Sequence, residues 1–197
     1  RRASTRAPHA NVDTVAGGGG ARPDERMEGA ATLKAAFREN GNGKAGNSWP
    51  VNGGAAAVVI VSDRKAKELG LRPLARIVAT GVSALAPEIM GLGPIDASKQ
   101  ALKRAGMTID DVDVVEINEA FAAQVIPSAR ARGIDPFSDK LNPHGGAIAL
   151  GHPFGMTGAR ILCTLLNEMA ADNRTIGLET MCVGGGQGMA MIVERLN

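Results

Sequence analysis

Aromatic residues are scarce in this 197-residue sequence: they make up 3% of it, with one tryptophan and no tyrosine. Aliphatic side chains and alanine must therefore fill the interior, since 44% of the residues are hydrophobic. No run approaches the roughly 18 consecutive apolar residues of a membrane helix, so we expect no membrane span. The net charge is only +2, with both signs interspersed, which argues against a nucleic-acid-binding surface.

Cysteine is equally rare. Cys163 and Cys182 are the only two, and no apolar signal segment opens the chain. A pair of cysteines in a chain of this length predicts reduced thiols and a cytoplasmic protein rather than a disulfide framework. The acid-free start RRASTRAPHA leaves the remnant of a transit peptide as an alternative. No metal site is expected.

Glycine and proline are abundant, with 26 and 10 residues, and they are densest near the start. Residues 1–54 are rich in glycine, asparagine and proline, and a segment of this composition is not expected to form a core of its own. The sequence also begins without methionine. We therefore expect residues 1–54 to be a loop-rich fragment that precedes the ordered part.

Order is expected from residue 55 onwards. Apolar runs predict strands over 55–62, 74–83 and 112–117, and the C-terminal stretch predicts a strand, a glycine turn and a strand. Helices are expected over 63–70 with Asp63 as N-cap, over 95–106 with Asp96 as N-cap, after Asn118 with a bend or end at Pro127, and over 158–172. The last of these has an apolar face that should lie on a sheet. The prediction is an α/β domain with a mixed five-stranded sheet.

Three residues next to breaks between these elements could carry chemistry. Asn118 follows a strand, His152 lies in a glycine-rich bend, and Cys182 ends a strand before three glycines. Ligands of α/β sheets bind outside the carboxyl ends of strands. Taken singly, each residue has a structural interpretation: a helix cap, a loop histidine and a core thiol. Together they match the residue types of papain-like hydrolases, but Cys182 precedes glycines and a strand, which suits a thiol base better than a nucleophile activated by a helix dipole.

Three long motifs resemble the C-terminal half of the thiolase family of acyl-CoA acyltransferases. They are EINEAFAA with Asn118, NPHGGAIALGHPFGMTGAR with His152, and MCVGGGQGMAMIVERL with Cys182. The resemblance implies a thiolase-like layered αβα domain. It divides the chain into a loop-domain fragment (1–54), the last strand and helix of the N-terminal half (55–72), and the C-terminal domain (73–197).

The resemblance also implies roles for these residues in the reversible thiolytic cleavage and Claisen condensation of 3-ketoacyl-CoA with CoA. His152 would activate a nucleophilic cysteine and would form an oxyanion hole with a water held by Asn118. Cys182 would be the acid/base at the α-carbon of acetyl-CoA. The residue types fit, because a carbanion beside a thioester needs a nearby base and hydrogen-bond donors to its oxygen.

Substrate contacts follow from the same resemblance. The backbone N–H of Gly184 would belong to a second oxyanion hole, and Ala120 and Phe121 would line the channel for the pantetheine arm. Coenzyme A is then a substrate, and no permanently bound cofactor is implied. His144, in NPHGG where many members have asparagine, resembles degradative members of fatty acid β-oxidation. The family implies a homodimer or a homotetramer.

The sequence departs from the family in two respects. The nucleophilic cysteine of the family lies in an N-terminal half that is absent here, so we expect the chain to be inactive alone and to need that half. Trp49, with Pro50 beside it, stands where members usually have a small residue close to CoA. This substitution leaves open a noncatalytic relative that binds CoA or lipid.

Overall fold

The computed structural model describes residues 22–196. Its elements in chain order are α1 (Met27–Thr32), η1 (Ala45–Asn47), α2 (Asp63–Glu68), β1 (Ala75–Ala84), η2 (Pro87–Leu92), α3 (Gly93–Ala105), η3 (Ile109–Asp111), β2 (Val114–Ile117), α4 (Ala122–Ala131), α5 (Ala147–Leu150), α6 (Thr157–Ala171), β3 (Ile176–Val183) and β4 (Gln187–Arg195). Within these described residues, no helix has the length and apolar character to cross a membrane.

One mixed sheet organises the fold. Its strands lie in the order β1-β4-β3-β2. Strand β4 pairs antiparallel with both β1 and β3, whereas β2 pairs parallel with β3. Strands β3 and β4 form the hairpin predicted at the C-terminus, with left-handed Gly185 and Gly186 in its turn. The expected mixed α/β architecture is confirmed.

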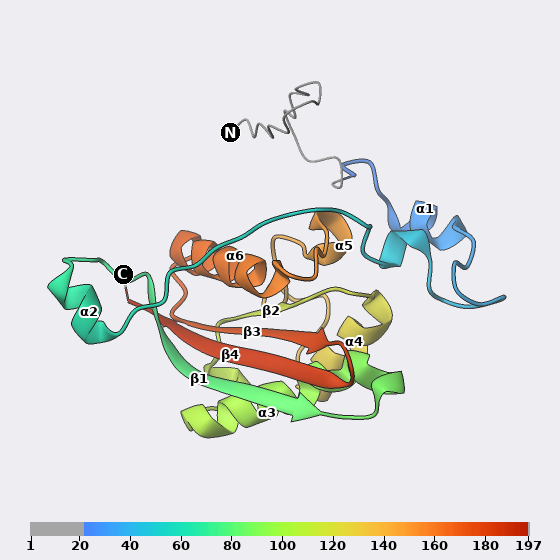
Figure 1. Ribbon diagram of the computed structural model, residues 1–197. Helices are drawn as coiled ribbons and strands as arrows, with labels where there is room; N and C mark the ends of the chain where they lie inside the picture. The colour runs from blue at the N-terminus through green and yellow to red at the C-terminus, as the bar shows by residue number, and fades with distance from the viewer. Residues whose placement is uncertain (1–21, 197) are drawn as a thin grey trace, which may run out of the picture.

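Helices cover both faces of the sheet, which gives the layered αβα arrangement (Figure 1). Helices α3 and α4 pack on one face, where their side chains join Leu178 and Ile192 in the larger core. Helix α6 lies on the other face, and its predicted apolar stripe is confirmed by the burial of Ile161, Leu162, Leu165 and Met169. Burial of each such side chain contributes about 1.5–3 kcal/mol, so this stripe anchors α6 on the sheet.

The prediction of a strand over 55–62, and with it of five strands, is wrong. These residues form no strand, and the sheet has four. The segment passes over α6 on its way to α2 and pairs with neither edge strand of the sheet (Figure 1). Its apolar residues Val58, Val59, Ile60 and Val61 remain exposed. Its valine-rich composition suits a buried strand, but a strand also needs a hydrogen-bonding neighbour.

Several predicted helix ends also need correction. Ser62, not Asp63, caps α2, and its hydroxyl accepts a hydrogen bond from the Lys65 amide at 3.2 Å. Helix α3 begins two residues before the predicted start, so Asp96 lies in its first turn instead of capping it. Pro127 neither ends nor divides α4, which continues through it to Ala131.

Glycine lets α3 approach the sheet backbone closely. A Cβ atom on Gly188 of β4 would lie 2.2 Å from the carbonyl carbon and oxygen of Gly93 at the start of α3. A Cβ atom on Gly81 of β1 would lie 2.1 Å from the carbonyl oxygen of Ala97. Backbone atoms cannot move aside as a flexible side chain can, so these positions require glycine.

Replacing Gly188 with alanine is therefore expected to lower the free energy of unfolding by about 3 kcal/mol or more, because α3 must separate from the sheet. Urea unfolding monitored by circular dichroism measures the change. Gly53→Ala is the matched control, since nothing lies within 4 Å of its would-be Cβ. Equal unfolding midpoints for the two variants would contradict the packing argument.

Candidate active site

The carboxyl ends of β2 and β3 meet at one edge of the sheet. Ile117 ends β2 opposite Thr180 of β3, and the next amide, of Asn118, donates to the Thr180 carbonyl at 3.0 Å. Cys182 lies two residues beyond Thr180 on β3. The parallel pairing therefore brings Asn118 close to the end of the strand that carries Cys182, although 64 residues separate them in the sequence.

His152 reaches this edge from a loop. Its Nε2 atom lies 3.3 Å from Nδ2 of Asn118, and both side chains are buried. The buried Oδ1 atom of Asn118 has no hydrogen-bond partner among the described residues. Burial, together with the positive charge of Arg160, lowers the pKa of His152. The pair is thus a neutral imidazole beside a carboxamide that has one free acceptor.

Glu119, which follows Asn118, fixes the loop that carries His152. One carboxylate oxygen accepts from the Ile148 amide at 3.1 Å, and the other accepts from Nδ2 of Asn142 at 3.0 Å. A Cβ atom on Gly146 would lie 2.4 Å from the carboxyl carbon of Glu119. The Asn142 amide also pairs with both backbone groups of Ile117, at 2.8 and 2.9 Å. The strand end and the loop are therefore joined by buried and partly buried hydrogen bonds.

The position directly before His152 also requires glycine, because the backbone and a neighbouring side chain leave no space for a Cβ atom. Gly151 has φ = 101°, and a Cβ atom there would lie 2.0 Å from Nδ2 of Asn52. The Asn52 side chain accepts a hydrogen bond from the His152 amide at 3.1 Å. Glycine thus supplies the left-handed backbone and the space that bring Asn52 onto the His152 backbone.

The few aromatic residues gather around His152. Four of the chain's five aromatic residues, Phe37, Trp49, Phe121 and Phe154, form what we call the aromatic cluster. The Trp49 and Phe154 rings lie 5.5 and 5.0 Å from the imidazole, centre to centre. Two of the five aromatic rings thus contact the imidazole directly, and Phe121 and Phe37 extend the cluster away from it through Trp49.

The thiol of Cys182 is 5% exposed, and burial raises its pKa. It is therefore a neutral thiol near pH 7. No hydrogen bond joins it to Asn118 or His152 within residues 22–196. The structure thus places His152 and Asn118 in contact and Cys182 at the same sheet edge. Gly184 follows in the exposed turn, where a Cβ atom would have nothing within 4 Å.

The two residues expected at the pantetheine channel pair with the N-terminal segment. The carbonyl of Ala120 accepts from the Trp49 amide at 3.2 Å, and Phe121 forms an isolated bridge with Ser48. Ala120 is buried, and the Phe121 ring lies 4.7 Å from the ring of Trp49. Trp49 is therefore in direct contact with the residues expected to line the channel.

Two buried glutamates and a partly buried arginine lie between the sheet and α6. Glu116 and Glu179 are register partners on β2 and β3, and Arg160 of α6 lies 3.9 Å from Glu116. Burial raises the pKa of Glu116 and of Glu179 to about 8, although Arg160 acts against each shift. One guanidinium cannot neutralise two ionised carboxylates, so a proton is retained here at neutral pH.

Stability should consequently fall as the pH rises. Between the ordinary glutamate value of 4.5 and about 8, the folded protein keeps protons that the unfolded chain releases. The free energy of unfolding should then decrease by up to about 1.4 kcal/mol per pH unit for each proton concerned. Urea titrations at pH 5, 6, 7 and 8 measure the slope. Glu116→Gln should flatten it, and a slope as steep as that of the original protein would contradict this account.

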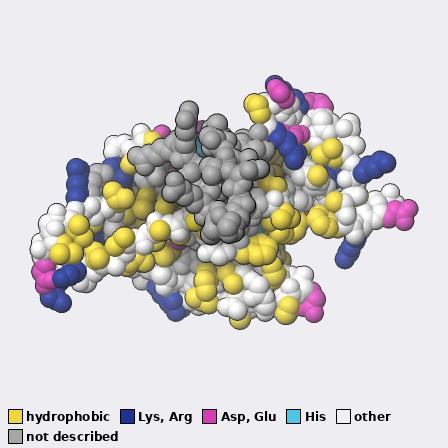
Figure 2. Space-filling model, turned by 45° about the horizontal axis from the view of Figure 1, so that its top comes forward, with side chains coloured by type: hydrophobic (Ala, Val, Ile, Leu, Met, Phe, Trp, Pro, Cys, Tyr) yellow, Lys and Arg dark blue, Asp and Glu magenta, His cyan; other side chains and the backbone are white. Residues whose placement is uncertain are grey.

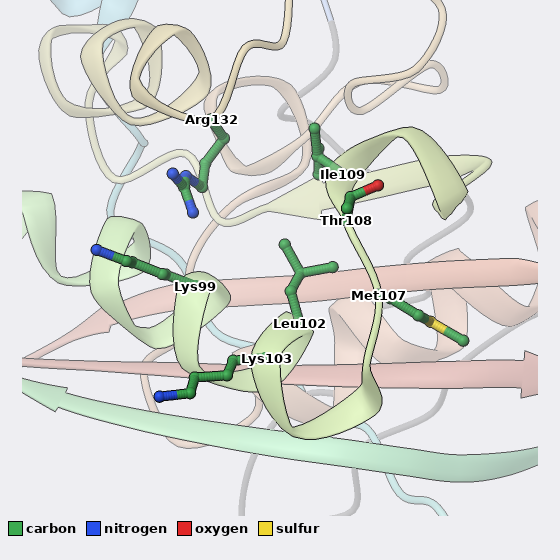
Figure 3. Close-up of a pocket in the computed structure, with 7 residues that line it drawn as sticks. All are labelled: Lys99, Leu102, Lys103, Met107, Thr108, Ile109 and Arg132. Carbon is green, nitrogen blue, oxygen red and sulfur yellow. The ribbon is translucent and has the colours of Figure 1, made fainter.

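Two hollows lie elsewhere. One, of about 410 Å³, lies between segment 55–62, α6 and the sheet, and Glu179 is among its lining residues. The other, of about 350 Å³, lies beside α3 on the opposite face of the sheet from α6, and Figure 3 shows Lys99, Lys103 and Arg132 around its apolar Leu102. Neither is lined by His152 or Cys182. Among residues 22–196, no group of three or more histidine, cysteine or acidic residues could hold a metal ion.

Sequence reasoning missed several residues that support the site. Asn52, Glu119, Asn142 and Thr157 all hold the His152 loop through hydrogen bonds. Glu119 and Thr157 lie inside the motifs around Asn118 and His152. Their polar side chains beside buried residues were the available signal, but nothing in the spacing indicates which atoms they contact.

Comparison with known proteins shows the family of this chain. Residues 71–195 match the family description "Thiolase, C-terminal domain". An acetyl-CoA acetyltransferase of Syntrophomonas wolfei is 52% identical over 86% of this chain and 43% of its own length. A 3-ketoacyl-CoA thiolase of Stutzerimonas stutzeri is 49% identical over 89% of this chain and 45% of its own length.

Solved structures give the same result. The Bacillus anthracis acetyl-CoA acetyltransferase superposes with a TM-score of 0.93 at 39% identity, over 100% of this chain and 49% of the other. Human mitochondrial 3-ketoacyl-CoA thiolase in complex with CoA superposes with a TM-score of 0.83 at 41% identity, over 90% of this chain and 45% of the other. The chain spans less than half the length of these relatives, and it belongs to the thiolase family.

Proposed function

We propose that this chain is the C-terminal half of an acyltransferase that cleaves 3-ketoacyl-CoA with CoA and runs the reverse Claisen condensation. A cysteine thiolate of the N-terminal half attacks the keto carbon, the bond between the α- and β-carbons breaks, and the acyl group stays on that cysteine as a thioester. The electron pair of the broken bond becomes the enolate of acetyl-CoA, which takes a proton. The thiol of CoA then receives the acyl group.

His152 and Asn118 serve the attacking cysteine in this proposal. The neutral imidazole accepts the thiol proton, and the resulting imidazolium and a water held by Asn118 stabilise the oxyanion. The unpartnered Oδ1 of Asn118 supports the water-binding role, because a buried acceptor needs a donor. The lowered pKa of His152 supports the role of base, since the resting imidazole must be unprotonated.

Cys182 and Gly184 serve the departing acetyl-CoA. A thiol whose pKa is raised by burial rests in the protonated form, and so it can donate the proton that the enolate takes. In condensation the same group, as thiolate, removes the α-proton. The exposed backbone of Gly184 would donate its N–H to the thioester oxygen of the acyl-enzyme, with no Cβ in the way.

The contact between Asn118 and His152 carries the proposal, because two motifs 34 residues apart meet there. Its test is thiolysis of acetoacetyl-CoA by CoA, followed through acetyl-CoA formation with the protein in its complete natural form. We expect turnover by the complete protein and none by this chain alone. Absence of turnover by the complete protein would overturn the proposal.

The rest of the N-terminal half would pack against segment 55–62 and α6. The run Val58–Val61 is exposed, and so are Val82 of β1 and Met189 of β4. Figure 2 shows hydrophobic side chains spread over the face on which this segment lies. Apolar surface of this extent favours a covering partner. In this arrangement residues 1–54 belong to the loop domain, 55–72 close the N-terminal half, and 73–197 form the C-terminal domain.

The proposal also extends to the oligomeric state, the cellular location and the substrates. We infer a homodimer or a homotetramer, a cytoplasmic location supported by two free cysteines, and a role in fatty acid β-oxidation. Coenzyme A and acyl-CoA bind as substrates, next to Ala120 and Phe121, and no resident cofactor is needed. One observation favours the alternative of a noncatalytic CoA- or lipid-binding relative: the Trp49 ring lies 5.5 Å from the imidazole and contacts Phe121. CoA binding without thiolysis would support that alternative.

A further inference from the structure

The loop that carries His152 continues directly into α6, and the first residue of this helix contacts the imidazole. Oγ1 of Thr157 lies 2.6 Å from Nδ1 of His152, on the ring edge opposite Asn118. Thr157 is 0% exposed and His152 is 8% exposed, so water does not compete for this contact. The imidazole is thus held between a carboxamide and a hydroxyl.

The direction of these hydrogen bonds follows from the proton of the hydroxyl. The carbonyl of Pro153, 3.0 Å away, can only accept, so both contacts are hydrogen bonds only if Thr157 donates to that carbonyl and Oγ1 accepts from His152. Nδ1 of the imidazole must then carry a hydrogen. In a neutral imidazole the other nitrogen, Nε2, has the lone pair, which faces the N–H of Asn118 at 3.3 Å.

We propose that Thr157 is a positioning residue that holds His152 in the Nδ1–H tautomer and so presents Nε2 as the basic atom. The inference rests on the proposed function, in which His152 takes a proton from a thiol. Only the nitrogen with the lone pair can accept that proton, and the opposite tautomer would point an N–H at the same place. Burial and Arg160 both keep the imidazole neutral, and it is in this state that the tautomer matters.

Helix α6 offers a matched control. Thr164 donates its hydroxyl to the carbonyl of Arg160, four residues earlier, at 3.1 Å, as Thr157 does to Pro153. Valine at either position keeps the shape and removes one such hydrogen bond. Only the change at Thr157 also removes the acceptor from His152. A purely structural role would make the two variants equivalent.

The tautomer is measured by nitrogen-15 NMR of histidine-labelled complete protein, in its original form and as Thr157→Val, Thr157→Ser and Thr164→Val. We expect the Nδ1–H form of His152 in the original protein, in Thr157→Ser and in Thr164→Val, and loss of that preference in Thr157→Val. Thiolysis by Thr157→Val should show kcat lowered by about 100-fold with KM for CoA within about twofold, since only proton transfer is affected. Thr157→Ser should recover most of the activity.

Three outcomes would overturn the inference: an Nε2–H tautomer in the original protein, an unchanged tautomer in Thr157→Val, or Thr157→Ser as impaired as Thr157→Val. The original protein and Thr157→Ser decide the question even where the valine variant does not fold. The NMR result does not depend on turnover. A protein that shows the expected tautomers but no thiolysis would therefore contradict the proposed function and leave the role of Thr157 in place.

Discussion

Cys182→Ser is expected to lower condensation and thiolysis by about 1,000-fold or more while acyl transfer to the cysteine of the N-terminal half continues. A serine hydroxyl is a far weaker acid than a thiol and has no populated anion at neutral pH, so it cannot exchange a proton with the α-carbon of acetyl-CoA as a thiol does. Acyl transfer does not use this proton. Exchange of label between acyl-CoA and CoA measures acyl transfer, and acetoacetyl-CoA cleavage measures the complete reaction.

Cys163→Ser is the matched control, because Cys163 is the other free cysteine and lies in α6 away from the sheet edge. Its two rates should stay within about twofold of the original values, as for a substitution outside the site. Condensation that survives in Cys182→Ser would show that Cys182 is not the acid/base. Loss of both rates together would instead assign Cys182 to the acyl-transfer step.

His152→Ala should lower both rates, by about 1,000-fold, because in the proposed reaction the imidazole activates the nucleophile on which both depend. The alanine variant also removes the ring that Asn118 and Thr157 hold, so Asn118 loses its partner at the site. Rapid mixing with acyl-CoA, with acylation of the protein read by mass spectrometry, isolates the first step. Acylation at the original rate would mean that another group activates the thiol.

His144→Ala serves for comparison, since His144 is exposed and lies in the same loop region. We expect acylation by this variant at nearly the original rate. Together with Cys182→Ser, the two histidine variants separate the steps. We expect His152 to be needed for both steps, Cys182 for the second step alone, and His144 for neither.

Local sequence patterns predicted the fold well where the pattern depends on one element or on one hairpin. The apolar stripe of α6 and the hairpin β3–β4 follow from periodicity and glycine, and both are present. The strand over 55–62 failed for a different reason. Valine and isoleucine indicate what a segment prefers to bury, whereas a strand also depends on a neighbour that the segment itself does not contain. In this structure that segment crosses α6 with its apolar side chains exposed.

Sequence analysis identified the two residues that meet at the candidate site but not the residues that hold them. Asn118 and His152 were identified because each lies at a break between elements, and the structure places them 3.3 Å apart. Thr157 was not identified, because a threonine at a helix start has an ordinary structural explanation and its contact with Nδ1 depends on how the loop folds. Which nitrogen of an imidazole is basic depends on atoms that no spacing rule describes.

The aromatic cluster has an optical consequence. Trp49 is the only tryptophan of this chain, and there is no tyrosine. The near-ultraviolet fluorescence of the chain therefore comes from one indole. The centre of this indole ring lies 5.5 Å from the centre of the His152 ring. The indole therefore lies next to the imidazole of the candidate site. A change in the imidazole's charge, or an acyl-CoA that displaces the indole from Phe121, would alter the brightness and colour of that emission without any label being attached.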